Sequence, residues 1–436
     1  MSDSEQTPAH ISDKETRPAP TRRHLVAGAL GAGIGALATE TIHRMSPETH
    51  QETTKEQKVA PLQESRTSFY GARQAGIDTP APAIGHFIAI DLNDDTDTQQ
   101  LSRLLRILTD DAAQLTQGHA PIVDQEPELA ETPASLTITF GFGEKIFEIA
   151  NPRQKPPWLK PLPPFAQIDQ LQERWSDGDL LIQICADDRM TVAHAQRMLL
   201  KDTRTFGTIR WVQEGFRHAY GSQKPGQTMR NLFGQVDGTV NPTTSDNSME
   251  QVVWGKHPKT PAWEENGTSI VIRRIHMNLD TWDEADRIAR EDAVGRKLSN
   301  GAPLTGEKEH DIPDLSATDH LGFNVIAPYA HIRRASPQEP QERILRRGYN
   351  YDLPVTDASG FSRHGETTGG ISQSGLIFAS YQSDPTQQFV PIQERLAQLD
   401  MLNTWTVPIG SAVFAIPAGC QENGFIGENL FKPSQP

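Results

Sequence analysis

The sequence predicts an α+β protein made of two similar halves. Four segments share one pattern, in which an extended apolar stretch is followed by an acidic turn and an amphipathic helix. Further strands lie between these segments, such as Leu136–Phe140, in which apolar and polar side chains alternate. Two strand–helix–strand units in each half are what duplicated ferredoxin-like domains with antiparallel sheets require, although the periodicity alone leaves the topology open.

The first two segments lie in the N-terminal half. The predicted strand Gly85–Leu92 precedes a helix whose leucines recur every three or four residues from Leu101, and this helix stops at Gly118. The apolar run Gly178–Asp188 ends in two aspartates, and a second helix follows it through about Lys201.

The other two segments lie in the C-terminal half. The strand Ser269–Ile275 precedes a helix predicted around Trp282–Ile288. The strand Gly375–Tyr381 precedes Asp384 and Pro385, which we expect to cap a helix and form its first turn. The apolar stripe of that last helix comprises Phe389, Ile392, Leu396 and Leu399.

The N-terminus predicts an export signal. Arg22 and Arg23 precede an apolar run rich in Ala and Gly, Leu25–Ala38, which ends with small residues at the first and third of its last three positions. Paired arginines before a weakly apolar core are typical of twin-arginine signals. We therefore expect a twin-arginine signal peptide at 1–38 and a flexible spacer at 39–66. The alternative is a membrane anchor, although the run is shorter than the roughly 20 residues that span a bilayer; tethering without cleavage stays open.

The remaining chain is long enough for two domains. A polar, Pro-bearing stretch near 243–263 separates the halves, so we predict an N-terminal ferredoxin-like domain at 67–250 and a C-terminal one at 251–436. With 41 basic and 56 acidic side chains, the net charge is -15, which argues against a nucleic-acid partner. The two cysteines, Cys185 and Cys420, cannot form a four-thiolate metal site. Cys185 lies in an apolar run and is expected to be buried, and a disulfide between the two is left open.

Three motifs could carry chemistry. In Asn231–Pro242, an Asp-Gly pair (Asp237 and Gly238) predicts a hairpin turn, but its carboxylate is flanked by apolar residues and would suit proton transfer. In the second motif, the apolar run Phe323–Ala327 predicts a strand, and His331 follows it beside two arginines. The simplest interpretation of His331 is a loop histidine in a basic surface patch. The alternative is a haem site, because a neutral imidazole can ligate haem iron and guanidinium groups can bind haem propionates.

The third motif, Arg343–Asp352, taken alone is a solvated basic run. In their order and spacing, however, Gly-x-x-Asp-Gly (234–238), Ala-His-Ile-Arg (330–333) and Ile-Leu-Arg-Arg-Gly-Tyr (344–349) resemble the dye-decolourising (DyP-type) haem peroxidases. The resemblance extends from about Gln74 to Gly424. Within the family the chain is most similar to the exported deferrochelatase/peroxidase group of the ferrous-iron uptake operon, because of its leader and its tail at 402–414.

The resemblance implies one haem b per chain, bound in the C-terminal half. His331 would be the proximal ligand of the haem iron, Asp237 the distal acid/base and Arg346 the distal arginine. Further cofactor contacts are implied at Arg333, Gly234, Gly238 and Phe378. The chain departs from its relatives at Ser336-Pro337-Gln338, where Asn-Pro-Arg is usual. We expect a carboxylate to accept a hydrogen bond from the other ring nitrogen of His331, and Asp384 and Glu394 are candidates.

The resemblance also implies the reaction. The enzyme would reduce hydrogen peroxide and oxidise small-molecule reductants such as dyes, phenols or ferrous iron, and it would release iron from haem. The alternative is a non-catalytic haem- or iron-binding component that delivers cargo to an iron-uptake permease. Export predicts a periplasmic, extracellular or envelope-associated protein. The sequence leaves open whether the chain forms a homo-oligomer.

Overall fold

The computed structural model describes residues 61–224, 226–245, 247–254, 264–355, 361–362, 365–366 and 370–432. The predicted signal peptide and most of the predicted spacer lie outside these residues, so both stay predictions. Contacts divide the chain into Met1–Gln57 and one compact unit, Lys58–Pro436. Within the described ranges, we find no helix with both the length and the apolar character that crossing a membrane requires.

The first half of the compact unit has the ferredoxin-like order of elements. These are β1 (Ile84–Leu92), α1 (Thr98–Thr116), β2 (Thr137–Phe142), α2 (Glu144–Ala150), β3 (Leu180–Ala186), α3 (Arg189–Thr203) and β4 (Gly207–Phe216). The four strands lie in the order β2-β3-β1-β4, and each neighbouring pair is antiparallel.

The second half repeats this arrangement. Its elements are α4 (Ser248–Val252), β5 (Thr268–Met277), α5 (Leu279–Glu284), α6 (Arg287–Val294), α7 (His331–Ala335), β6 (Leu345–Arg346), β7 (Tyr349–Leu353), β8 (Phe361–Ser362), β9 (Gly365–Glu366), β10 (Gln373–Gln382), α8 (Phe389–Leu399) and β11 (Thr406–Ile416). The main strands lie in the order β11-β5-β10-β7, all antiparallel, which is the order of the first half. The predicted duplicated ferredoxin-like fold is therefore confirmed.

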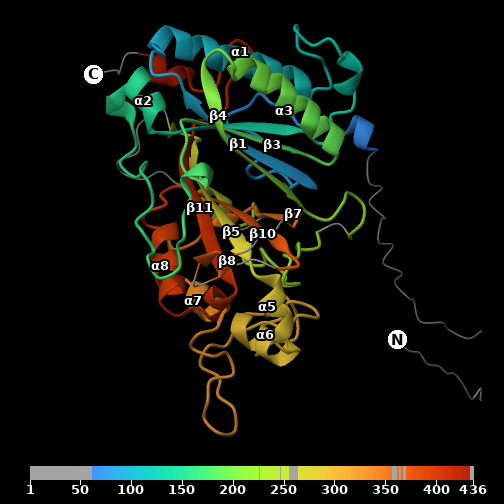
Figure 1. Cartoon of the computed structure of the whole chain (residues 1–436), viewed down its shortest axis with the longest axis vertical. Helices are drawn as coiled ribbons and strands as arrows, with labels where there is room; N and C mark the ends of the chain where they lie inside the picture. Colours follow the sequence, from blue (N-terminus) through green and yellow to red (C-terminus); the bar gives the residue numbers. More distant parts are fainter. Residues whose placement is uncertain are drawn as a thin grey trace, which may run out of the picture. The chain divides into compact units, whose positions relative to one another are not determined.

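The two sheets meet edge to edge. One residue pair joins β11 to β2 (Ala415 and Phe142), and one joins β4 to β7 (Phe216 and Asn350), so the strands form a closed ring. The side chains inside the ring, among them Phe87, Tyr349 and Phe414, come from both halves and form one apolar core. Figure 1 shows α1 and α3 beside β1, β3 and β4, and α5 to α8 grouped around β5, β10 and β11.

Local sequence signals explain the best-predicted helices. The Asp97 side chain accepts a hydrogen bond from the Gln100 amide at 2.8 Å and the Gln100 side chain bonds back, so a capping box begins α1. Its predicted apolar face is buried, from Leu101 through Leu115. Asp188 caps α3 through the Thr191 amide at 2.9 Å. Cys185 is buried as expected, and both cysteines are free.

Two helices of the second half differ from their predictions. The helix expected around Trp282–Ile288 is interrupted, because the Asp286 side chain accepts the Ala289 amide at 2.8 Å and starts α6 separately. Ile288 consequently points outward, with 79% of its surface exposed. Asp384 holds a turn, and α8 begins only at Phe389; Leu399, at its end, is 51% exposed.

The predicted strand Phe323–Ala327 is wrong. Only Asn324 makes a β-type pair there, an isolated bridge with Thr318. The Asp319 side chain accepts hydrogen bonds from the amides of Leu321 and Phe323, at 2.8 and 2.9 Å, and so bends the chain into a turn. The proposed domain boundary at 250/251 is not tested by these contacts and stays a prediction.

Candidate active site

The Asp237 motif forms a hairpin, but its turn lies earlier than the sequence suggests. Arg230 and Val236 form an antiparallel bridge, and the turn between them includes Gly234 at φ +77°. The Asp237 amide donates to Met229 O at 2.9 Å, and Gly238 follows at φ +115°. These two glycines therefore shape the loop that holds the Asp237 carboxylate.

Asp237 faces the arginine predicted to be its partner. Arg346 Nη1 lies 3.1 Å from Asp237 Oδ1, and the two side chains are 30% and 18% exposed. Arg346 belongs to β6, which pairs with β10 at Ser380 and Tyr381. Asn231 also reaches the carboxylate, since its Nδ2 donates weakly to Asp237 Oδ2 at 3.5 Å. A carboxylate and a permanently charged guanidinium therefore lie side by side at this place in the structure.

His331 is the first residue of α7, and a carboxylate holds its ring. The Nδ1 atom lies 2.6 Å from Oδ2 of Asp400, which is 4% exposed on its side chain. Asp400 is in turn fixed because its Oδ1 accepts the Leu402 amide at 3.0 Å. A histidine whose Nδ1 hydrogen-bonds a buried carboxylate presents Nε2 as the ligand atom, an arrangement typical of metal-binding imidazoles.

The three groups act on one another electrostatically. Burial lowers the pKa of His331, but the negative charge of Asp400 and its hydrogen bond outweigh this and leave the pKa raised. Smaller contributions come from Arg346, which lowers the pKa, and from Asp237, which raises it. Asp237 and Arg346 therefore lie within electrostatic reach of the His331 ring.

An apolar cluster lies beside these polar groups. Phe233 from the Asp237 loop stacks on Trp282 with 4.3 Å between ring centroids, and Ile332 and Phe378 pack against the same cluster. The remaining members are Met277, Ala293, Val294, Leu376, Trp405, Leu232, Ile275, Leu279, Ala285 and Leu402. An imidazole with a carboxylate behind it, an acid paired with a guanidinium within electrostatic reach, and an apolar wall fit the needs of a haem group. The residues present are therefore suited to hold haem.

Arg333 lies apart from this set. Its Nε donates to Ile326 O at 3.0 Å, and its Nη2 donates to Leu315 O and Ile326 O, both at 2.6 Å. The guanidinium therefore ties down the loop before α7, and its predicted contact with a propionate stays a prediction. The haem contacts predicted at Gly234, Gly238 and Phe378 likewise stay predictions.

Sequence reasoning missed Asp400. Of the two carboxylates expected behind His331, Asp384 holds the turn before α8 through the Thr386 amide at 2.8 Å, and Glu394 is exposed. The carboxylate that hydrogen-bonds to the histidine is that of Asp400, so this expectation is corrected to Asp400. The only local signal was an Asp before a 3₁₀ turn, Met401–Thr404, which predicts a cap and not a partner for a distant residue.

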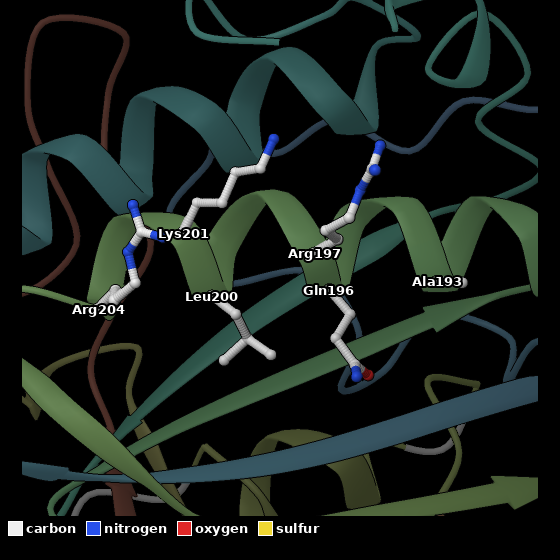
Figure 2. Close-up of a pocket in the computed structure, with 6 residues that line it drawn as sticks. All are labelled: Ala193, Gln196, Arg197, Leu200, Lys201 and Arg204. Carbon is white, nitrogen blue, oxygen red and sulfur yellow. The ribbon is translucent and has the colours of Figure 1, made fainter. Parts of the chain in front are cut away.

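A surface hollow on α3 is unrelated to this site. It is lined by Ala193, Gln196, Arg197, Leu200 and Lys201 of α3 and by Arg204, the residue that follows this helix (Figure 2). Arg197 is already paired with Glu126 at 2.9 Å. The hollow contains none of the motif residues, and we assign it no role.

The family matches agree with the two halves. The profile "Dyp-type peroxidase, N-terminal" matches residues 74–217, and "Dyp-type peroxidase, C-terminal" matches residues 228–421. The chain is 34% identical over 435 residues to the "Dye-decolorizing peroxidase" of Thermobifida fusca (strain YX), which covers 95% of this chain and 98% of the relative. It is also 34% identical over 435 residues to the "Deferrochelatase" of Escherichia coli (strain K12), with 95% and 97% covered.

Solved structures give the same result. A DyP-type peroxidase from Cellulomonas bogoriensis has a TM-score of 0.80 and 46% identity, and the match covers 86% of this chain and all of the other. Ferric DtpA from Streptomyces lividans has a TM-score of 0.78 and 36% identity over the same shares.

Fold, site and matches together define the class: a haem-dependent oxidoreductase with a peroxide as electron acceptor. The chain belongs to the dye-decolourising (DyP-type) peroxidase family and carries both of its domains in order. Its substrates are hydrogen peroxide and a small-molecule reductant. The motif-based recognition of the family is confirmed.

Proposed function

We propose that His331 ligates the haem iron through Nε2, and that Asp237 and Arg346 act on peroxide at the opposite face of the haem. One observation carries this proposal: Asp237 and Arg346 form an ion pair at 3.1 Å within electrostatic reach of the His331 ring. All three residues lie within residues 228–421, which match the C-terminal domain of the family, and this supports haem binding there.

In this proposal, bound haem supplies the iron at which peroxide is reduced and the electrons of the donor are collected. The Asp237 carboxylate takes the proton from one oxygen of hydrogen peroxide and returns it to the other, so that the departing oxygen leaves as water. The Arg346 guanidinium stabilises the negative charge that develops on the departing oxygen. Asp400 holds the His331 ring and increases its basicity through Nδ1.

Single variants of the haem-loaded enzyme test these roles. His331→Ala should lose haem, seen as loss of the Soret band relative to protein absorbance. Asp237→Ala should keep the band and react with peroxide roughly 10²–10⁴ times more slowly in stopped flow. Arg346→Leu should also keep haem and slow the same step. His310→Ala, which changes a histidine 74% exposed, and Asp283→Ala, which changes an aspartate 70% exposed, are matched controls. Full haem occupancy in His331→Ala, or an unchanged rate in Asp237→Ala, contradicts the assignment.

We extend the proposal to the donor and to haem iron. The family supports oxidation of dyes, phenols or ferrous iron, and the relatives named deferrochelatase, 34% identical, support release of iron from haem. Incubation with haem and a reductant should then yield iron-free protoporphyrin, seen by its fluorescence, together with iron that a ferrous chelator detects. If the haem stays intact after many turnovers of peroxide, iron release is refuted, whereas the peroxidase activity is not.

The non-catalytic carrier is not favoured, since the chain matches the peroxidase family over both domains. Export is also part of the proposal. Arg22, Arg23 and the apolar run after them support a twin-arginine signal, and hence a periplasmic, extracellular or envelope location with access to an iron-uptake permease. Replacing both arginines with lysines should keep the protein in the cytoplasm of its host, which fractionation would detect.

A further inference from the structure

Asn241 lies four residues after Asp237, and its side chain contacts the backbone of Arg346. Its Nδ2 donates to Arg346 O at 2.7 Å, and the Arg346 amide donates to Asn241 Oδ1 at 3.0 Å. One side-chain amide thus satisfies both backbone groups of the arginine proposed to act on peroxide.

These two bonds replace a missing strand. β6 has only two residues, and its contact with β10 includes the bond from the Arg347 amide to Ala379 O at 2.8 Å. The N–H and C=O of Arg346 point to the other side, where Asn241 meets them. Without Asn241, the backbone of Arg346 would have no β-type partner on that edge among the described residues. A two-residue strand held on one side alone is weakly fixed.

The same loop is anchored at its other end. The Asn350 side chain on β7 donates to Arg230 O at 3.1 Å, and the Arg230 guanidinium donates to Gly234 O at 2.7 Å. The loop that carries Asp237 is therefore tied to β7 at its start and to β6 at Asn241. Its geometry relative to Arg346 follows from these side-chain bonds.

We propose that Asn241 is a positioning residue that holds Arg346 opposite Asp237. This inference rests on the proposed role of Arg346. Covalent continuity links Asn241 to Asp237, and two hydrogen bonds link it to Arg346, so Asn241 sets the 3.1 Å contact between the acid and the guanidinium. A small displacement of a charged group from its reacting position costs a large factor in rate.

A double-mutant cycle on the haem-loaded enzyme tests this. Asn241→Ala should keep the Soret band and slow the reaction with peroxide by about 10- to 100-fold. Because Asn241 acts through Arg346, the double variant Asn241→Ala/Arg346→Leu should be no slower than Arg346→Leu alone. A second readout, independent of turnover, is the dissociation constant of cyanide. This anion binds the same face and should bind more weakly to Asn241→Ala and to Arg346→Leu.

Gln74→Ala is the matched control. Gln74 also uses its side-chain amide to hold a strand, since its Nε2 donates to Phe140 O at 3.0 Å and its Oε1 accepts the Phe140 amide at 2.8 Å. These bonds lie on β2, in the other half. This variant should unfold at a lower temperature but react with peroxide and bind cyanide like the parent protein. A kinetic loss as large as that of Asn241→Ala would mean that Asn241 acts through general stability, and would refute the proposal.

Other outcomes distinguish the role of Arg346 from the role of Asn241. If Arg346→Leu slows the enzyme but Asn241→Ala does not, or if their effects multiply, the positioning role is wrong and the role of Arg346 stands. An unchanged rate in Arg346→Leu overturns both. If Asn241→Ala does not fold, Asn241→Asp keeps the acceptor for the Arg346 amide, removes the donated bond and adds a negative charge that faces the Arg346 carbonyl. A parental rate and cyanide affinity in that variant would also overturn the proposal.

Discussion

The carboxylate behind His331 gives the sharpest test of the haem site. Asp400→Asn keeps the size of the side chain and removes its charge. In the parent protein, Asp400 Oδ2 lies 2.6 Å from His331 Nδ1 and is shielded from water, with 4% of the side chain exposed. A charge-assisted hydrogen bond then becomes a neutral one, and the histidine becomes a weaker ligand.

The size of the effect follows from that bond. Hydrogen bonds to charged groups contribute about 1.5–3 kcal/mol and neutral ones about 0.5–1.5 kcal/mol, so the change costs about 1–2 kcal/mol. This corresponds to haem retention weaker by a factor of roughly 5 to 30. The ferric/ferrous reduction potential should rise, because a less basic imidazole stabilises ferric iron less well.

Two measurements check this prediction. Transfer of haem to an excess of apomyoglobin gives relative retention, and a spectroelectrochemical titration gives the potential. Asp286→Asn is the matched control, since Asp286 also caps a short helix, through the Ala289 amide at 2.8 Å, but is exposed at the N-terminus of α6. If Asp400→Asn retained haem as the parent does, at the parent potential, then Asp400 would act only as a helix cap, and its proposed effect on the basicity of His331 would be refuted.

Three further predictions concern stability. Asp169→Asn leaves the buried Arg273 without its ion pair and should cost about 3–5 kcal/mol in urea unfolding; a cost below 1 kcal/mol would contradict it. Glu250→Gln breaks an exposed pair with Arg73 and should cost at most about 1 kcal/mol in the same assay. Burial, together with a neighbouring carboxyl on α1, raises the pKa of Asp202 to about 8. Because the folded pKa lies above the unfolded one, stability falls as pH rises between these values. Asp202→Asn should therefore match the parent melting temperature at pH 4 and exceed it at pH 9; an equal difference at both would refute this.

The sequence was most informative where one local rule decides the structure. The spacing of Leu101 and its neighbours, with Asp97 before them, predicts α1 because periodicity and capping agree. The strand predicted at Phe323–Ala327 was wrong, because apolar composition favours a strand there, whereas the Asp319 side chain, four residues earlier, accepts the Phe323 amide and turns the chain. Apolar composition alone does not show whether a neighbouring strand is available to pair with.

The residues of the site also fall into those that a local motif predicts and those that only the structure shows. Asp237, His331 and Arg346 could be named from motifs because each lies in a short recognisable string. Asp400 could not, since its partner is 69 residues away along the chain and its local sequence indicates only a cap. The bonds of Asn241 to Arg346 likewise join residues 105 positions apart along the chain. Contacts of this kind are set by tertiary structure.

The placement of Tyr349 has a consequence for how this family can vary. The side chain of this tyrosine, which belongs to β7 of the second half, lies against Gly85 on β1 and Gly215 on β4. A Cβ at Gly85 would come within 2.7 Å of a ring carbon, and one at Gly215 within 2.6 Å of the tyrosine Cβ. The first half therefore supplies two glycines without side chains, and the second half supplies the tyrosine side chain that fills the space they leave. A chimaera that joins one half to the opposite half of a relative would inherit only one side of this fit. Exchange between relatives should succeed only when the glycines and the aromatic residue are transferred together.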